Sequence, residues 1–484
     1  MNGPAGIPWM TVEDVLDATG GELKRGAAGT GLRFQGCAID SRTIQEGELF
    51  VPLPGSNVDG HAFVASALEG QAAGSLVARG AAWSAGSAPS SKPVIEVEDP
   101  LAALQAIGRH CRERSGVPTV AVTGSNGKTT TKEMIAAVLG ARLRVHRNVG
   151  NLNNHIGVPL TLSHLEPEHQ VLVIEMGMSA RGEIAFLASL ARPDVGVITN
   201  ASAAHLEQLG SVEEIARAKS ELAESLRPDA LLVVNADDAL LWTMNRSRPT
   251  TVRGYALDNR EADLRPDSVT ESGDGGTRFT LPDGTEVTLA LLGRHNVRNA
   301  LAAILVGDRF GIPRGEAARA LGALRPAKHR LERVTTPGGV HVIDDAYNAN
   351  PASMKAALQL LGSMDARGVR RAVLGDMLEL GPEASRLHED VGRAVPKDAW
   401  LYAAGGHAAD LERGASSAGV VAERIRRFDD VPAMVTAVAR DVRPGDLVLV
   451  KASRGMRLER VIEALMGASG TGHGAAAAAP AGRA

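Results

Sequence analysis

A glycine-rich stretch with a lysine and two threonines is the part of the sequence whose residue types indicate chemistry most directly. Residues 123–130 read Thr-Gly-Ser-Asn-Gly-Lys-Thr-Thr. The run Val117–Val122, rich in β-branched residues, precedes them, and apolar residues at helical spacing follow up to Gly140. A strand, a glycine loop and a helix that begins with Lys-Thr form the context of a phosphate-binding loop, where backbone N–H groups bind phosphate oxygens. We therefore predict that this loop binds a nucleoside triphosphate.

The residues of the loop have separate expected roles. Gly124 and Gly127 let the backbone turn toward the phosphates. Lys128 reaches the β- and γ-phosphates, and the Thr129 hydroxyl ligates Mg²⁺. The general pattern has a glycine five residues before Gly127, where this chain has Val122, so the loop is a shortened variant. The expected ATP-binding residues of the loop are Gly124, Ser125, Asn126, Gly127, Lys128, Thr129 and Thr130.

Polar residues follow the next predicted strands. Gln170–Glu175 is a buried-strand pattern that ends in a carboxylate. Because ligands of parallel sheets lie at the carboxyl ends of the strands, Glu175 is expected to hold the Mg²⁺ that Thr129 also contacts. His205 follows the strand after that, and a metal or phosphate contact and a solvated loop histidine are equally open. Lys219 lies on a mostly apolar predicted helix, 211–226, where a lysine usually extends to solvent.

Two further regions contain polar residues that fit ligand contacts. The loop Asn148–His155 is too rich in asparagine to be core, and we assign Asn151 in it to substrate binding. Near the N-terminus, Ser41 and Arg42 follow a short strand, where the guanidinium fork of Arg42 matches phosphate oxygens. A merely solvated arginine is the alternative for that turn.

The composition excludes several classes of protein. Hydrophobic residues make up 44% and charged residues 22% of the chain, as in soluble globular proteins. Only 3% of residues are aromatic and the net charge is −4, so nucleic acid is not an expected partner. Cys37 and Cys111 lie far apart without a Cys-x-x-Cys pair, which fits a reducing compartment. No secretion signal or 18-residue apolar run is evident, so we expect a cytoplasmic protein that does not bind membranes.

The length of 484 residues and the alternation of strands and helices predict an α/β protein of three domains. Polar, turn-rich residues 260–286 indicate a hairpin insertion with Asp283-Gly284 at its turn. Hinges are expected near Gly116 and near Arg325-Pro326. The predicted units are a small α/β N-terminal domain (1–116), a central P-loop ATPase-like parallel-sheet domain (117–329), a C-terminal Rossmann-like doubly wound domain (330–466) and a disordered tail (467–484).

Several motifs occur together in one order. After the loop at 123–130 come Glu-Met-Gly at 175–177 and Gly-Arg-His-Asn-x-x-Asn at 293–299. In this order they resemble the Mur ligases of peptidoglycan synthesis, which, like the related folylpolyglutamate synthases, couple ATP cleavage to amide-bond formation. Asp-Asp-Ala-Tyr-Asn-Ala-Asn-Pro at 344–351 and Leu-Gly-Asp-Met-Leu-Glu-Leu-Gly at 374–381 resemble the member that adds D-alanyl-D-alanine to UDP-N-acetylmuramoyl-tripeptide. The resemblance covers residues 10–466.

The resemblance implies roles for individual residues. Glu175 and His205 match positions that hold magnesium, and Lys219 matches a lysine that is carbamylated in related ligases and ligates a second Mg²⁺. Ser41 and Arg42 match the turn that receives the UDP-sugar. The remaining implied contacts are Asn296 and Asn299 with adenine and ribose, Asp344, Tyr347, Asn348 and Asn350 with ATP and the dipeptide, and Ser453 and Arg454 near the dipeptide.

The activity that the resemblance implies is an ATP- and Mg²⁺-dependent amide ligation. A carboxylate of the acceptor peptide attacks the γ-phosphorus to give an acyl phosphate and ADP, and the amine of D-alanyl-D-alanine then displaces phosphate. We expect small-molecule substrates and a monomer. Another Mur ligase or a folylpolyglutamate synthase-like ligase is the alternative within the family. An ATPase or kinase, or a nucleotide-sensing protein without turnover, is the alternative outside it.

Overall fold

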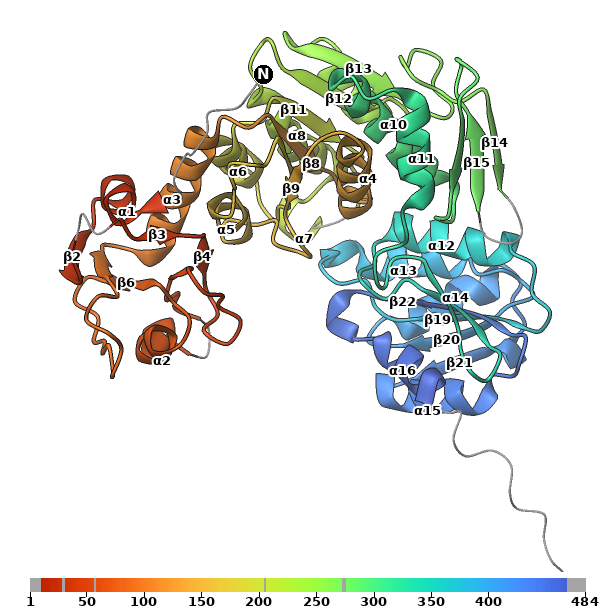
Figure 1. The fold of residues 1–484 in the computed structure, drawn as a ribbon. Helices are drawn as coiled ribbons and strands as arrows, with labels where there is room; N and C mark the ends of the chain where they lie inside the picture. Colours follow the sequence, from red (N-terminus) through yellow and green to blue (C-terminus); the bar gives the residue numbers. More distant parts are fainter. Residues whose placement is uncertain (1–9, 28–30, 56–57, 204–205, 272–275, 468–484) are drawn as a thin grey trace, which may run out of the picture.

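The computed structural model describes residues 10–27, 31–55, 58–203, 206–271 and 276–467. His205 and nearly all of the predicted disordered tail therefore lie outside the described residues. The chain forms an α/β protein in which three large sheets succeed one another along the sequence. Figure 1 shows the sheet-containing units in chain order, with the N-terminal unit at one end of the molecule and the C-terminal unit at the other.

The N-terminal unit is a small α/β structure. Its five-stranded sheet has the order β2-β7-β6-β5-β4, in which β2 is antiparallel to β7 and the other pairs are parallel. The predicted first helix starts with a capping box, because Thr11 and Asp14 each bind the other's backbone N–H. The elements are β1 (Met10–Thr11), α1 (Val12–Thr19), β2 (Glu22–Arg25), β3 (Arg33–Phe34), β4 (Cys37–Ala38), β5 (Leu49–Phe50), η1 (Gly60–Phe63), α2 (Val64–Glu69), β6 (Gly74–Ala78), β7 (Val94–Val97) and α3 (Pro100–Ser115).

The central unit is built on six parallel strands in the order β13-β12-β11-β8-β10-β9. Successive residues of β8 pack on opposite faces, with Val120 and Val122 against α4 and α10 and Ala121 against α5, α6 and α8. The strands are β8 (Thr119–Thr123), β9 (Val145–Arg147), β10 (Val171–Glu175), β11 (Val195–Ile198), β12 (Leu231–Asn235) and β13 (Thr251–Tyr255). The helices are α4 (Lys128–Gly140), α5 (Gly157–Ser163), α6 (Glu183–Ala191), α7 (Leu206–Leu209), α8 (Val212–Glu224), α9 (Ala239–Asn245), α10 (Arg294–Arg309) and α11 (Arg314–Ala323).

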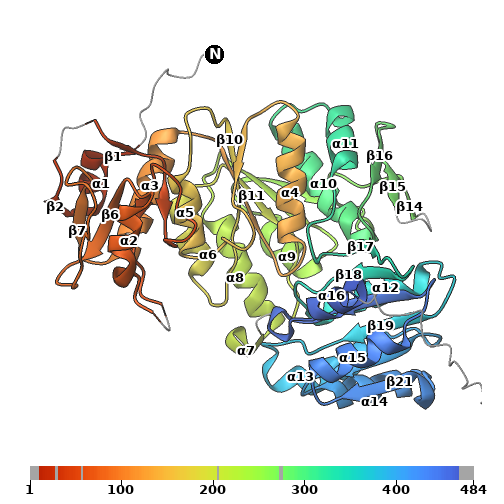
Figure 2. The same cartoon turned by 60° about the horizontal axis from the view of Figure 1, so that its bottom comes forward.

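The predicted hairpin insertion is present and carries one more strand than expected. Strands β15 (Thr277–Thr280) and β16 (Glu286–Leu289) are antiparallel, and the Asp283 side chain accepts a hydrogen bond from Thr285 N at 3.0 Å in the turn between them. Strand β14 (Ser268–Glu271) extends them to a three-stranded sheet. Figure 2 shows this sheet at the outer edge of the central unit, beside α10 and α11.

The C-terminal unit is the doubly wound sheet that the sequence predicted. Its order is β17-β18-β22-β19-β20-β21, and only β17 is antiparallel to its neighbour. Helices α12, α13 and α14 cover one face, and α15 and α16 cover the other. The elements are β17 (Glu332–Thr335), β18 (His341–Asp344), α12 (Pro351–Ser363), β19 (Arg370–Leu374), η2 (Gly381–Glu383), α13 (Ala384–Gly392), β20 (Trp400–Ala404), α14 (Ala408–Ser417), η3 (Ala422–Arg424), β21 (Ile425–Phe428), α15 (Val431–Asp441), β22 (Leu447–Lys451), η4 (Arg454–Met456) and α16 (Glu459–Gly467).

No helix in the described part of the chain is both long enough and apolar enough to span a membrane.

Candidate active site

The glycine loop joins β8 to the first residue of α4, as the sequence predicted. Gly124 and Gly127 both have positive φ, at 150° and 77°. A Cβ at Gly127 would lie 2.8 Å from Asn299 Oδ1, and a Cβ at Gly124 would overlap the Thr199 side chain. Glycine is therefore needed at both positions for the backbone conformation and for space. The N-terminus of α4 has no side-chain cap, so its N–H groups are available to an anion.

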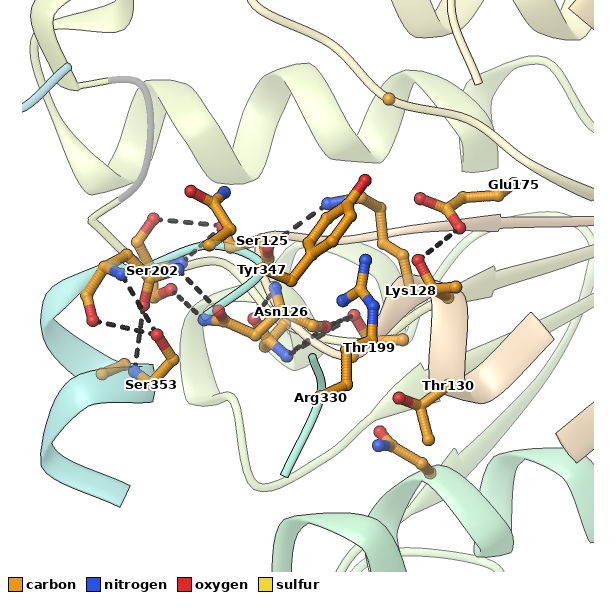
Figure 3. A pocket seen from close by; sticks show the side chains of 18 of the residues that line it. Ser125, Asn126, Lys128, Thr130, Glu175, Thr199, Ser202, Arg330, Tyr347 and Ser353 are labelled. Carbon is orange, nitrogen blue, oxygen red and sulfur yellow. Dashed lines mark hydrogen bonds between the residues drawn. The ribbon is translucent and has the colours of Figure 1, made fainter. Parts of the chain in front are cut away.

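Lys128 is folded over the loop. Its Nζ donates to the carbonyl oxygens of Gly124 at 2.7 Å and Ser125 at 3.2 Å. Burial lowers the pKa of Lys128, and the carboxylate of Glu175 opposes that shift. Figure 3 shows the side chains of Lys128, Tyr347 and Arg330 grouped together, with Glu175 to their side. The lysine charge therefore lies where the phosphates of a nucleotide in this loop would need it.

Glu175 and Thr129 form the pair expected for a metal site. Glu175 is 2% exposed at the end of β10, and its Oε2 accepts a hydrogen bond from Thr129 Oγ1 at 2.8 Å. Its Oε1 accepts from Asn153 Nδ2 at 2.7 Å. Oxygen donors of this kind are what Mg²⁺ prefers, so the residues present fit that ion. Asn153 was not singled out from the sequence, although it belongs to the predicted asparagine-rich loop.

Residues that follow β11 form hydrogen bonds with the glycine loop. Asn126 N donates to Asn200 Oδ1 at 2.9 Å, and the Asn126 carbonyl accepts from Thr199 Oγ1 at 2.6 Å. Asn126 Nδ2 also donates to Ser202 Oγ at 2.8 Å, and Ser125 Oγ donates to the Ser202 carbonyl at 3.1 Å. These contacts tie the loop to the residues that follow β11. Strand-end placement was the signal in the sequence for this region.

Helix α10 contributes the predicted asparagines. Asn296 and Asn299 are buried, and Asn299 Nδ2 donates to Asn296 Oδ1 at 3.0 Å. Both line the same cavity as the glycine loop. His295 also lines it, and burial lowers the pKa of His295 to about 4, so its imidazole is neutral at pH 7. The sequence analysis did not predict a role for His295.

The C-terminal unit reaches directly into the site. Asn350 Nδ2 donates to Asn126 Oδ1 at 2.5 Å, which joins the first residue before α12 to the glycine loop. The Arg330 guanidinium carbon lies 4.0 Å from the centroid of the Tyr347 ring. Both residues line the cavity. The sequence reasoning missed Arg330, which precedes β17 in the connection between the units and carries no strand-end signal.

A buried ion pair lies on the same wall. Lys451 Nζ contacts Asp345 Oδ2 at 2.6 Å and donates to the Asn348 carbonyl at 2.9 Å. Burial raises the pKa of Asp345, and the charge of Lys451 opposes that shift. Lys451, Asp345 and Asn348 all line the cavity. Of these three, the sequence analysis had named only Asn348 as a site residue.

Asp344, by contrast, is not among the lining residues. It is 2% exposed and its Oδ2 lies 2.7 Å from His329 Nδ1. Asp344 ends β18, so the next residue, Asp345, points to the other side of the sheet. The carboxylate that reaches the cavity is therefore that of Asp345.

Five other predicted residues lie away from the cavity lining or on its margin. Asn151 is exposed, and the cavity is lined instead by Asn153, Asn154 and His155 of the same loop. Ser453 Oγ accepts from Leu378 N at 2.9 Å, a contact within the C-terminal unit. The Arg454 guanidinium carbon lies 5.7 Å from the centroid of the Tyr347 ring. Arg42 lies in the N-terminal unit after Ser41, and it is bound by Asp40 through Nε at 2.9 Å and Nη2 at 2.6 Å.

Lys219 differs from what its residue type predicted. It is 2% exposed on α8, so the expectation that it extends to solvent is wrong. Burial, and secondarily the charge of Lys128, lowers the pKa of Lys219 well below its usual value. Its ammonium makes no hydrogen bond to any residue in the described ranges. A neutral amine is the form that carbamylation requires.

The lining residues named above surround one cavity of 730 Å³ between the central and C-terminal units. Its volume and the polar groups in its lining fit a nucleotide, with the glycine loop and Lys128 for phosphates and Thr129 with Glu175 for Mg²⁺. Among the predicted residues, the loop from Ser125 to Thr130, Glu175, Asn296, Asn299, Tyr347, Asn348 and Asn350 are brought together there.

Comparison with known proteins agrees with this geometry. Family profiles match residues 33–112 (Mur ligase family, catalytic domain), 122–307 (Mur ligase middle domain) and 329–454 (Mur ligase, glutamate ligase domain). The UDP-N-acetylmuramoyl-tripeptide–D-alanyl-D-alanine ligase of Bacillus subtilis (strain 168) is 41% identical, over 90% of this chain and 93% of that one. The chain belongs to the Mur ligase family. The Escherichia coli (strain K12) ligase of the same name is 34% identical, over 94% of this chain and 98% of that one.

Solved structures of Mur ligases share the whole architecture. A crystal structure of MurF from Acinetobacter baumannii is similar with a TM-score of 0.81 and 29% identity, over 95% of this chain and 99% of that one. MurF ligase from Thermotoga maritima in complex with ADP is similar with a TM-score of 0.74 and 28% identity, over 89% of this chain and 96% of that one. This Mur ligase is thus an enzyme of the three-domain ligase type.

Proposed function

We propose that this Mur ligase joins D-alanyl-D-alanine to UDP-N-acetylmuramoyl-tripeptide at the expense of ATP, in bacterial peptidoglycan precursor synthesis. The observation that carries the proposal is the placement of Lys128, Thr129 and Glu175 in one cavity with residues of the C-terminal unit. The names of the relatives from Bacillus subtilis and Escherichia coli support this choice of substrates. The proposed units remain residues 1–116, 117–329 and 330–466, with the UDP-sugar bound by the first at Ser41 and Arg42.

The residues have distinct proposed roles in phosphoryl transfer. The peptide carboxylate attacks the γ-phosphorus, ADP leaves, and Lys128 and the N-terminus of α4 stabilise the negative charge that spreads over the phosphoryl oxygens. Thr129, Glu175 and His205 would hold Mg²⁺, which when bound neutralises charge on the nucleotide phosphates. Asn296 and Asn299 hold the nucleoside. Asp345, in place of Asp344, supplies the carboxylate that we expected to contact ATP or the dipeptide.

The second step forms the amide. The free amine of D-alanyl-D-alanine attacks the acyl carbon, the C–O bond to phosphate breaks, and the amine loses a proton. An acyl phosphate hydrolyses in water, so the cavity has to be closed while the intermediate exists. Tyr347, Asn348 and Asn350 line it from the C-terminal unit. We propose that this unit acts as the lid and that Arg454, beside Tyr347, lies toward the dipeptide with Ser453.

The test is phosphate release by the purified protein with ATP, Mg²⁺, UDP-N-acetylmuramoyl-tripeptide and D-alanyl-D-alanine. We expect release that needs both substrates and yields the pentapeptide product by mass. Lys128→Ala should lower turnover on the order of 10²–10³-fold with the fold intact, because charge stabilisation at the phosphoryl group is lost. Lys397→Ala, an exposed lysine of the C-terminal unit, is the control. Phosphate release at the same rate with and without D-alanyl-D-alanine would refute the ligase activity.

A further inference from the structure

Asn148 is a buried asparagine whose amide is fully used by backbone groups. It follows β9 and is 1% exposed. Glu175 N donates to Asn148 Oδ1 at 2.9 Å, and Asn148 Nδ2 donates to the carbonyl of Glu175 at 3.1 Å and to that of Leu152 at 2.8 Å. The side chain thus binds both backbone groups of Glu175, as a neighbouring strand would. The expectation that amides of this loop face a ligand does not apply to Asn148.

Lys132 connects the backbone of Asn148 to the helix that carries the phosphate-binding residues. It lies on α4 one turn after Lys128 and Thr129, and its side chain is fully buried. Its Nζ donates to the backbone carbonyl of Asn148 at 2.6 Å and contacts Glu133 Oε1 at 3.1 Å. A buried ammonium is retained in proteins only where it is paired and hydrogen-bonded. Glu133 supplies the pairing, and the hydrogen bond of Lys132 holds the backbone carbonyl of Asn148 in place.

The contacts of Lys132, Asn148, Glu175 and Thr129 form a closed ring. Helix α4 holds Asn148 through Lys132, Asn148 holds the backbone of Glu175, and the Glu175 carboxylate returns to Thr129 of α4 at 2.8 Å. Asn153 binds the other carboxylate oxygen at 2.7 Å. The backbone of Glu175 is therefore tied to α4 through Asn148 and Lys132, in addition to the direct contact between its carboxylate and Thr129.

We propose that Lys132 and Asn148 are positioning residues that set the distance between the Glu175 carboxylate and the Thr129 hydroxyl, and thereby the affinity of the nucleotide site for Mg²⁺. This inference rests on the proposed function in taking Glu175 and Thr129 as metal ligands. Neither Lys132 nor Asn148 lines the cavity, so neither contacts the nucleotide. Partners of metal ligands that do not themselves touch the metal typically change metal affinity by 10–100-fold when removed.

The experiment measures binding of the non-hydrolysable ATP analogue AMP-PNP by calorimetry, once with Mg²⁺ and once with EDTA. The ratio of the two affinities isolates the metal contribution. We expect Lys132→Met, which keeps the volume, and Asn148→Ala each to lower this ratio about 10-fold while leaving the affinity in EDTA unchanged. In the double variant the two losses should not add, because both break one chain of contacts.

Asn245→Ala is the matched control. Asn245 is also a fully buried amide of the central unit, and its Nδ2 donates to Ser220 Oγ and to the Leu241 carbonyl, both at 2.9 Å. It lies outside the cavity lining, so its loss should lower stability and leave the affinity ratio unchanged.

The outcomes separate the inference from the function on which it rests. An unchanged ratio in folded Lys132→Met and Asn148→Ala would overturn the positioning role, and so would a failure of both variants to fold, since that indicates a purely structural role. Glu175→Ala is measured beside them. If that variant keeps the full ratio, the metal assignment of the proposed function fails instead.

Discussion

At the scale of residues, the site contains two lysines whose pKa values are lowered by burial. Lys219 is buried and Lys128 is half-buried, desolvation lowers the pKa of both amines, and the charge of Lys128 lowers the pKa of Lys219 further. The two differ in their partners. Lys128 donates to two loop carbonyls, whereas the Lys219 ammonium has no hydrogen-bond acceptor in the described part of the chain. Lys219 is therefore the lysine that we propose to carry a carbamate, which would supply an anionic metal ligand.

The carbamate can be observed directly. Protein equilibrated with ¹³C-bicarbonate should show a lysine carbamate resonance by NMR, because the neutral amine of Lys219 attacks CO₂. The resonance should be absent in Lys219→Ala, which has no amine at this position. Lys397→Ala should keep the resonance. A spectrum of the unsubstituted protein without such a resonance would remove Lys219 from the set of metal ligands.

The residue scale also shows what the sequence could and could not predict. Lys128, Thr129 and Glu175 were predictable because their local pattern, strand then loop then helix, fixes where they point. The sequence analysis predicted Asp344 as a site residue, but Asp345 is the one that reaches the cavity. Neighbouring residues at the end of a strand point in opposite directions, and the sequence pattern does not reveal which of the two faces the ligand. Arg330 and Lys451 approach from the C-terminal unit, and their distance from the glycine loop is a property of the packed units.

At the scale of elements, the junction of β8 and α4 was predictable to within two residues, because glycines and helical periodicity mark it. The same junction is intolerant of side chains. Gly127 is the residue before α4, with φ of 77° and with Asn299 Oδ1 against the place of a Cβ.

Gly127→Ala should therefore weaken both stability and nucleotide binding. A left-handed residue other than glycine costs about 1–2 kcal/mol, and the new methyl group displaces Asn299. Urea unfolding measures the first effect and AMP-PNP calorimetry the second. Gly182→Ala is the control, because Gly182 also has positive φ, at 85°, with open space at its Cβ and no contact with the loop. Equal nucleotide affinity in the two variants would contradict the role of Asn299.

At the scale of the whole molecule, the C-terminal unit docks through the residue that starts α12. Asn350 Oδ1 caps the helix by accepting from Ser353 N at 3.0 Å, while its Nδ2 binds Asn126 of the glycine loop. The contact between the two units and the conformation of the loop are thus linked at one side chain.

Two substitutions separate these roles. Asn350→Ser keeps an N-cap oxygen but is too short to reach Asn126, so we expect unchanged thermal stability and a turnover about 5-fold lower, the equivalent of one hydrogen bond of about 1 kcal/mol. Asn350→Ala should lose turnover and a further ~1 kcal/mol of stability. Wild-type turnover in Asn350→Ser would show that the contact does not assist closure.

The N-terminal unit is held to the central unit by a titratable contact. His164 Nε2 lies 2.8 Å from Glu48 Oε1, and its Nδ1 lies 2.9 Å from the Leu160 carbonyl. Burial disfavours the charged imidazole, but these two acceptors outweigh burial and raise the pKa of His164. Because the pKa is higher in the folded protein than the unfolded value of about 6.5, the contact stabilises fully below about pH 6.5 and is lost as pH rises through the folded pKa.

The difference in thermal midpoint between the unsubstituted protein and His164→Gln should therefore be larger at about pH 6 than at about pH 8.5. A scan of the midpoint against pH for both proteins measures it. A difference that stays constant over this range would show that the His164–Glu48 contact is not charged.

The central claim is that the γ-phosphate is transferred to the peptide carboxylate before the amide forms. UDP-N-acetylmuramoyl-tripeptide labelled with ¹⁸O in the reacting carboxylate tests it most directly, because the phosphate that leaves the acyl carbon keeps one carboxylate oxygen. With ATP, Mg²⁺ and D-alanyl-D-alanine, we predict one ¹⁸O atom in each released phosphate, read by mass spectrometry. Phosphate without ¹⁸O, formed together with ADP, would mean that water attacks the γ-phosphorus, and it would contradict the account.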